Sequence, residues 1–315
     1  MATSVPVSSP IIGVDVAKDE LVIYHQDQDR LETIANTAVA IKRWLKRLPG
    51  KTAVAIEATN TYHVLFADLA YAADCDLYII DGYALSHYRK GVNIRAKTDA
   101  IDARLLARYL KNEGHNLHRW TPPPALYRQL LSLFRKRAAL VQTRTRLTQS
   151  WANEPALKAA FQGHLRSMQK LEKRVEQMIR DLLDKAGLMG EVKRCMAVEG
   201  IGFLTAARLL ASYQRGLFSG GDAFIAFLGM DLRVAQSGRK KGHSKLTKRG
   251  DPEARRLLHN AAMSARRTSA WKPFYEAQRE RGFSTTQVMV MLARKLARVV
   301  FALLKSQGEY RSKAV

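Results

Sequence analysis

The sequence has very little cysteine and no long uninterrupted apolar run. Its two cysteines, Cys75 and Cys195, form no CxxC pair and no Cys/His spacing of the kind that holds zinc. A disulfide-stapled secreted domain and a zinc-finger protein are therefore excluded, and this cysteine usage is typical of a reducing cytoplasm. Residues 1–10 lack a signal-peptide pattern, and basic residues interrupt the apolar stretch 288–304. We therefore expect a cytoplasmic protein without a membrane span.

Acidic residues are also scarce, and the excess of basic over acidic residues is confined to one part of the chain. The sequence contains 52 Lys and Arg against 28 Asp and Glu, which gives a net charge of +24. Residues 1–110 hold 13 basic and 13 acidic residues, whereas residues 111–315 hold 39 and 15. An excess of this size repels itself unless a polyanion neutralises it, which favours a nucleic-acid partner. A membrane-surface protein fits this uneven distribution less well.

The first 110 residues alternate between strand and helix patterns, which predicts an α/β layer architecture. Asn36 is a plausible N-cap for the first predicted helix, and Pro49-Gly50 closes it. The predicted strands are 11–16, 21–24, 53–56 and 77–80, and the predicted helices are 37–48, 62–73 and 99–110.

The pattern breaks at the proline run 122–124, which predicts a linker. Leucines at helical spacing then predict two long helices packed as an antiparallel arm, with basic outer faces. Further helices follow, and the last of them begins at a capping Ser284. The predicted domains are residues 1–112 (catalytic), 113–125 (linker), 126–187 (helical arm) and 188–315 (a mostly α-helical C-terminal domain).

Four carboxylates in the first part of the chain form the clearest chemical signal. Asp15 and Glu57 each end an apolar strand, and a carboxylate there is costly unless it faces an open site. Asp99 and Asp102 are three residues apart on one helix face, where like charges repel unless a cation lies between them. Oxygen-only ligands favour Mg²⁺ or Mn²⁺, which assists phosphodiester displacement. Alternatively, Asp99 is a helix N-cap and Asp102 a first-turn acid.

A polar, basic loop follows residue 235. Between residues 239 and 256 it contains eight basic residues against two acidic ones, which predicts a phosphate-binding segment. Ser237 and Ser244 are both candidate nucleophiles, and the residue pattern does not choose between them; either could equally be a phosphate contact. Gly200-Ile201-Gly202 resembles a helix-hairpin-helix turn, whose backbone N–H groups approach phosphates, and a plain tight turn is the alternative.

Assembled in order, these motifs resemble the DEDD transposases of the insertion-sequence 110 family, relatives of the Piv-type DNA invertases. Residues 12–18 (IGVDVAK) resemble the family's first motif, residues 56–59 (IEAT) with Tyr62 its second, and residues 97–103 (KTDAIDA) its third. Residues 200–202 (GIG), 224–229 (FIAFLG), 237–238 (SG) and 248–250 (KRG) follow in the family's order.

The resemblance implies a RuvC-like (RNase H-type) N-terminal domain in which Asp15, Glu57, Asp99 and Asp102 bind the metal. It implies that Ser237, rather than Ser244, forms a covalent phosphoserine link to donor or target DNA. It also implies a non-coding bridge RNA, a homodimer that assembles into a tetramer with a shared active site, and action at the bacterial nucleoid. The candidate nucleic-acid contacts are Lys97, Gly200, Gly202, Arg239, Lys240, Lys241, Lys245, Lys248 and Arg249.

Two other functions remain open at this point. A metal-dependent, structure-specific nuclease such as a junction resolvase would use water as the nucleophile, and Ser237 would then contact phosphate only. A basic nucleic-acid scaffold would need neither the acids nor the serine for chemistry. A covalent protein–DNA adduct would distinguish a transposase that uses a serine nucleophile from both the nuclease and the scaffold.

Overall fold

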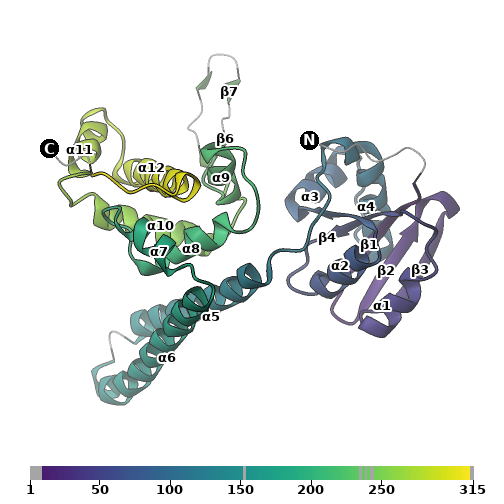
Figure 1. Cartoon of the computed structure of the whole chain (residues 1–315). Helices are drawn as coiled ribbons and strands as arrows, with labels where there is room; N and C mark the ends of the chain where they lie inside the picture. Colours follow the sequence, from purple (N-terminus) through teal and green to yellow (C-terminus); the bar gives the residue numbers. More distant parts are fainter. Residues whose placement is uncertain (1–8, 152–153, 234–235, 238–239, 242–244, 313–315) are drawn as a thin grey trace. The chain divides into compact units, whose positions relative to one another are not determined.

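The computed structural model describes residues 9–151, 154–233, 236–237, 240–241 and 245–312. The chain divides into two compact units, Met1–Pro122 and Pro123–Val315, each with its own core (Figure 1). The expected order, an α/β region followed by helices, is confirmed. No helix in the described ranges has both the length and the apolar character needed to cross a bilayer.

The first unit is built on a five-stranded mixed sheet in the order β3-β2-β1-β4-β5. The first three strands pair antiparallel, whereas β4 lies parallel to both β1 and β5. Val14 of β1 is opposite Ile23 of β2 on one side and Ile56 of β4 on the other. The strands are β1 (Ile11–Val16), β2 (Glu20–His25), β3 (Arg30–Ala35), β4 (Ala53–Glu57) and β5 (Asp76–Ile80).

Helices cover both faces of this sheet, because alternate residues of the buried strands supply two separate apolar clusters. Val14 and Ile56 pack with α1 and α2, whereas Ala53 and Ala55 pack on the opposite face with α3 and α4. The helices are α1 (Ala38–Leu45), α2 (His63–Ala72), α3 (Gly82–Gly91) and α4 (Asp99–Glu113). Short 3-10 turns are η1 (Gln26–Gln28) and η2 (Gly114–Asn116).

Two elements of this unit are absent from the sequence prediction, β3 and α3. β3 is an edge strand with charged residues and only partial burial, so its apolar alternation is weak. α3 begins and ends in glycine and buries only Leu85. The predicted N-cap of α1 is wrong by one residue: Thr37 caps the helix, whereas the Asn36 side chain donates to the Ala17 and Tyr62 carbonyls.

The second unit begins with a long antiparallel helix pair, α5 (Ala125–Ser150) and α6 (Lys158–Lys185), with η3 (Pro155–Leu157) preceding α6. Arg144 and Glu172 join the two helices at 2.6 Å. Nearer the core, Arg137 and Glu176 lie 3.9 Å apart. An earlier residue of α5 thus pairs with a later residue of α6, as expected for antiparallel helices. One end of the pair is buried in the helical core through Phe134 and other side chains.

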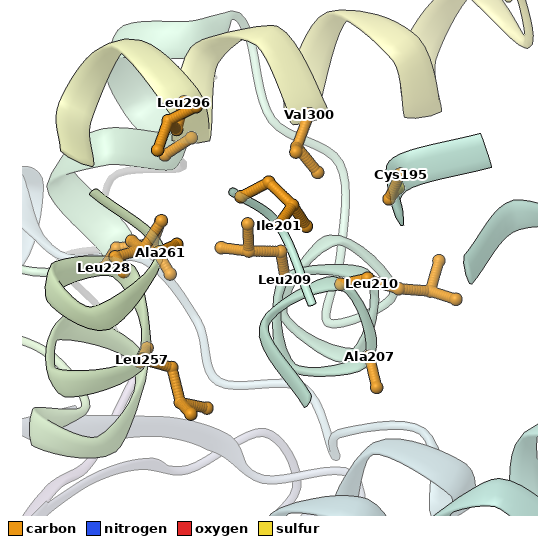
Figure 2. Close-up of a cluster of buried hydrophobic side chains, with 14 of the residues drawn as sticks. Cys195, Ile201, Ala207, Leu209, Leu210, Leu228, Leu257, Ala261, Leu296 and Val300 are labelled. Carbon is orange, nitrogen blue, oxygen red and sulfur yellow. The ribbon is translucent and has the colours of Figure 1, made fainter. Parts of the chain in front are cut away.

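The remaining helices pack around α12, the last of them. Figure 2 shows Leu296 and Val300 of α12 facing Ile201 and Leu209 in this core. The predicted start at Ser284 is confirmed, with a full capping box to Gln287. The helices are α7 (Met189–Met196), α8 (Phe203–Tyr213), α9 (Gly221–Phe227), α10 (Pro252–Ala265), α11 (Lys272–Glu280) and α12 (Thr285–Ser306).

Candidate active site

The four acids lie around the place where α4 crosses β1. Gly13 permits this crossing, because a Cβ there would lie 2.0 Å from the Ala103 carbonyl oxygen of α4. Side chains alternate along a strand, so Asp15 lies on the same sheet face as Gly13, the face that α4 covers. Asp99 and Asp102 occupy the first turn of α4, which Thr98 caps through its hydroxyl. The N-cap alternative for Asp99 is therefore wrong.

Glu57 ends β4 on the same face, and its carboxylate rests against the start of α3. A Cβ on Gly82 would lie 2.4 Å from Glu57 Oε1, so a larger residue at position 82 would require the Glu57 carboxylate to shift. Asp81 caps α3 by accepting from the Ala84 amide. The backbone of α3 thus positions the Glu57 carboxylate without a side chain between them.

The acids influence one another electrostatically. Burial, followed by the charges of Asp102, Asp99 and Glu57, raises the pKa of Asp15 to about 6. Burial and the charge of Asp102 also raise the pKa of Glu57, although Lys97 and Arg89 oppose that rise. Four carboxylates from two strands and one helix therefore share one region of negative potential.

A divalent cation fits this donor set in charge and chemistry. Within the described ranges, no three His, Cys, Asp or Glu side chains are grouped tightly enough to hold a metal as they stand. However, Asp102 Oδ1 is fully buried and accepts no aligned hydrogen bond from the described part of the chain, although Arg89 Nη2 lies 2.5 Å from it. Burial and then the neighbouring acid charges raise the pKa of Asp15, and a cation would relieve the part that comes from those charges. Carboxylate oxygens are the type of ligand that Mg²⁺ prefers.

Replacing Asp15 with asparagine is expected to stabilise the metal-free protein at pH 8. Because the folded pKa is raised to about 6, ionisation costs free energy, and stability declines as the pH rises from about 4 through 6. Asp15 is partly exposed, so solvent screening reduces the expected gain to about 1 kcal/mol. Urea unfolding at pH 8 and at pH 4 checks this: the difference between variant and wild type should shrink at pH 4. An equal difference at both values would contradict the raised pKa.

The basic loop of the second unit contains two short antiparallel ladders. β6 (Leu232–Arg233) pairs with β9 (Lys245–Leu246), and β7 (Gln236–Ser237) pairs with β8 (Lys240–Lys241). Ser237 is opposite Lys240, so the serine lies at the end of a strand beside a basic residue. Arg239 and Ser244 lie outside the described residues, as do the side chains of Ser237, Lys240 and Lys241.

The base of this loop is firmly built. Gly229, at φ +67°, and Gly250 pack so closely that a Cβ on Gly250 would lie 2.6 Å from the Gly229 nitrogen. Thr247 bonds to Asp231 through both its amide, at 3.0 Å to the carbonyl, and its hydroxyl, to the carboxylate. Arg255 Nη1 donates to the Gly250 carbonyl at 2.8 Å. The two chain segments that lead into and out of the Ser237 hairpin are therefore tied together.

A buried ion pair anchors the returning segment of this loop. Arg208 of α8 is only 1% exposed and donates to Asp251 Oδ2 at 2.7 Å and to the Ser212 hydroxyl at 2.7 Å. Asp251 also caps α10 by accepting from the Glu253 amide. The arginine charge holds the pKa of Asp251 below its usual range. One carboxylate thus joins α8, the start of α10 and the end of the basic loop.

Replacing Arg208 with alanine is expected to lower the free energy of unfolding by about 3–5 kcal/mol, because a buried carboxylate loses its counter-ion. The matched control is Arg298→Ala, which removes a surface pair with Asp222 of similar length, 2.6 Å, and should leave the free energy of unfolding close to that of wild type. Denaturant unfolding measures both. A loss at Arg208 no larger than at Arg298 would show that this pair does not anchor the loop.

The Gly200–Gly202 hairpin is a tight turn between α7 and α8, and its two glycines have different surroundings. Gly200 adopts φ +88°, and a Cβ there would lie 2.5 Å from the Ala265 Cβ of α10, so this glycine is required for packing. Gly202 caps α8 in an extended conformation, and no atom lies within 4 Å of where its Cβ would be. An open groove runs beside it, lined also by Asn260 and Ser264. The backbone at Gly202 is accessible to a phosphate, and the backbone at Gly200 is not a free surface.

Three functional features escaped the sequence analysis: Arg208, Gly82 and Arg89. Arg208 had a recognisable signal, because it interrupts the otherwise apolar helix 203–211 and a buried arginine requires a partner. Gly82 and Arg89 lie on α3, which was not predicted, and their roles depend on contacts with β4 and α4. No local pattern could have identified those two.

Two family models match successive parts of the chain. Residues 12–161 match a DEDD family model described as Transposase, and residues 192–276 match one described as Transposase IS116/IS110/IS902 family. Pilin gene-inverting proteins of Moraxella bovis and Moraxella lacunata are both 26% identical to the chain over 96% of its length and 98% of theirs. A probable family 20 transposase of Pseudomonas aeruginosa is 26% identical over 95% of the chain and 98% of its own length.

Proposed function

The chain belongs to the IS110 family of transposases, and we propose that it cuts and rejoins DNA through a covalent phosphoserine intermediate formed by Ser237. Its membership makes it a transposase or recombinase that acts on DNA. The observation that supports metal assistance is the cluster of four acids, Asp15, Glu57, Asp99 and Asp102, at the crossing of α4 and β1. The choice of Ser237 is supported by the resemblance of its Ser-Gly pair to that of the family.

The first unit supplies the metal-binding half of the proposed chemistry. Its strand order, with an antiparallel β1–β2–β3 meander and parallel β4 and β5, supports a RuvC-like (RNase H-type) domain. Asp15, Glu57, Asp99 and Asp102 would hold Mg²⁺ or Mn²⁺. A bound cation would supply stabilisation of the negative charge that develops at the reacting phosphate. The carboxylates themselves fix where that phosphate can be held.

The second unit supplies the proposed nucleophile. Ser237 Oγ loses its proton and attacks the phosphorus, and the bond from phosphorus to one DNA oxygen breaks. The DNA strand then ends in a hydroxyl, and its phosphate is a diester to Ser237. Attack by a hydroxyl of another DNA strand reverses these steps, restores the serine and joins the new strands. No phosphodiester is hydrolysed, so the energy of the bond is conserved.

Basic residues around Ser237 and on other helices would hold the nucleic acids. Lys245 is exposed, Lys248 and Arg249 lie at the base of the loop, and Lys97 lies beside the acids. The concentration of all the net positive charge in residues 111–315 supports a large polyanionic partner. We propose that the partner includes a bridge RNA as well as donor and target DNA, and that a homodimer assembling into a tetramer performs the exchange.

The direct test uses the purified chain, Mg²⁺, RNA transcribed from the DNA that flanks its gene, and supercoiled DNA carrying those flanks. The expected product is a recombinant junction, formed without net hydrolysis and only when RNA is present. Cut DNA with no joined product would favour a water-using nuclease instead. Binding without any cutting would favour a scaffold. Joining that proceeds equally well without RNA would contradict guidance by a bridge RNA.

A further inference from the structure

The guanidinium of an arginine lies beside one of the four acids. Arg89, in the last turn of α3, places its Nη2 atom 2.5 Å from Asp102 Oδ1. Both side chains are mostly buried, with 15% of Arg89 and 6% of Asp102 exposed. Arg89 also donates through Nη1 to the Ala96 carbonyl at 3.3 Å, in the segment that leads into α4. The positive charge of Arg89, on α3, therefore lies next to Asp102, on α4.

This pair differs from the ion pairs Arg256–Glu253 and Arg208–Asp251 in that no aligned hydrogen bond to Asp102 Oδ1 is present. Arg256 grips Glu253 with two aligned hydrogen bonds, of 2.7 and 2.6 Å. In contrast, Arg89 comes closest to Asp102 between Nη2 and Oδ1, and Asp102 Oδ1 accepts no aligned hydrogen bond from the described residues. Bidentate pairs fix geometry, whereas a single misaligned contact supplies mainly charge. Arg89 therefore offsets the charge of Asp102 without fixing the orientation of its carboxylate.

The surroundings explain why the cluster needs such a charge. Burial and then the charge of Asp102 raise the pKa values of Asp15 and Glu57, and the cations that oppose the rise at Glu57 are Lys97 and Arg89. Of these two, only Arg89 makes a close contact with one of the acids in the described structure. A divalent cation bound by the acids and the Arg89 guanidinium would compete for the same negative charge.

We propose that Arg89 is an internal counter-ion of the acid cluster, which stands in for the metal at Asp102 and is displaced when a divalent cation binds. It is a positioning residue: its guanidinium, held by α3 and by the Ala96 carbonyl, offsets the charge of Asp102 before metal arrives. Displacement also releases a guanidinium beside the metal, where a DNA phosphate would be its next partner. This inference rests on the proposed metal site.

Calorimetric titration of the full chain with Mn²⁺ at pH 8 tests the proposal. Arg89→Gln is expected to bind Mn²⁺ at least about tenfold more tightly than wild type, because a competing charge is removed. Arg89→Lys keeps the charge and should bind as wild type does. The matched control is Arg104→Gln, which removes an arginine of α4 that pairs with the exposed Asp29 at 3.3 Å and should change the affinity less than twofold.

The outcomes separate the two claims. Equal or weaker Mn²⁺ binding by Arg89→Gln, with wild type binding normally, overturns the counter-ion role and indicates a permanent support for Asp102. Failure of every protein to bind Mn²⁺ overturns the metal site and the counter-ion role together. Should Arg89→Gln not fold, the side-chain Nε–Hε signal of Arg89 in wild type provides the measurement. That NMR signal should move on titration with Mg²⁺ if the guanidinium is displaced, and an unmoved signal overturns the proposal.

Discussion

Replacing Asp102 with asparagine is expected to reduce DNA strand cleavage by at least about 10³-fold. Asparagine matches the shape of aspartate but removes the charge that a divalent cation needs, and the loss of metal-assisted charge stabilisation costs several kcal/mol in the transition state. Asp102 is the acid that raises the pKa of both Asp15 and Glu57, so its removal changes the whole cluster. Gel assays with a labelled DNA substrate, in Mg²⁺ and in Mn²⁺, measure the effect.

The matched control is Asp29→Asn, which removes a carboxylate of the same unit that is 78% exposed and pairs with Arg104 at the surface. It should cleave as wild type does. Asp102→Asn also leaves Arg89 without its ion-pair partner, so thermal unfolding must show that the variant is folded at the assay temperature. A folded Asp102→Asn protein with normal cleavage would refute a catalytic role for the acids.

Replacing Ser237 with alanine is expected to abolish both strand exchange and the covalent protein–DNA adduct. The loss should be at least about 10³-fold and reach the detection limit, because no other group replaces a missing nucleophile efficiently. Ser237→Ala should still bind DNA and Mn²⁺, because the four acids proposed to bind metal belong to the other unit. Denaturing gels that retain only covalent adducts provide the measurement.

Ser244→Ala is the control that decides between the two serines of the loop. It should keep the adduct and the exchange activity within a few-fold of wild type. Loss of the adduct in Ser244→Ala but not in Ser237→Ala would move the nucleophile to the second serine. Cleavage that survives in Ser237→Ala, without an adduct, would instead favour water as the nucleophile.

The acid cluster was the most predictable part of the site. Asp15 and Glu57 follow apolar strand residues, and the period of two in a strand assigns them a face. The spacing of Asp99 and Asp102 assigns them to one turn of α4. These rules are local, and parallel pairing of β1 with β4 then brings the strand acids to neighbouring positions.

The supports of the cluster were not predictable, because they depend on tertiary contacts. Gly13 and Gly82 read as ordinary glycines until α4 and α3 are placed against them. Arg89 reads as a surface charge on a helix with little apolar pattern, yet it is mostly buried against Asp102. Propensity and periodicity describe one element at a time, whereas these roles belong to pairs of elements.

The loop that contains Ser237 was the least predictable part of the site. A short polar segment rich in lysine has neither apolar periodicity nor a spacing that marks one serine as a nucleophile. The resemblance to the family, rather than the residue pattern, favoured Ser237. The pairing of β7 with β8 and the glycine contact at the loop base could not be anticipated, because both involve residues too few for a strand pattern.

Mapping the residue that carries the DNA tests the central claim most directly. The wild-type chain is incubated with labelled DNA and Mn²⁺, denatured and digested with protease, and the DNA-linked peptide is identified by mass spectrometry. The account predicts a nucleotide phosphate on Ser237, formed in wild type and absent from the Asp102→Asn protein. A nucleotide on any other residue, or cleaved DNA with no linked peptide, would contradict it.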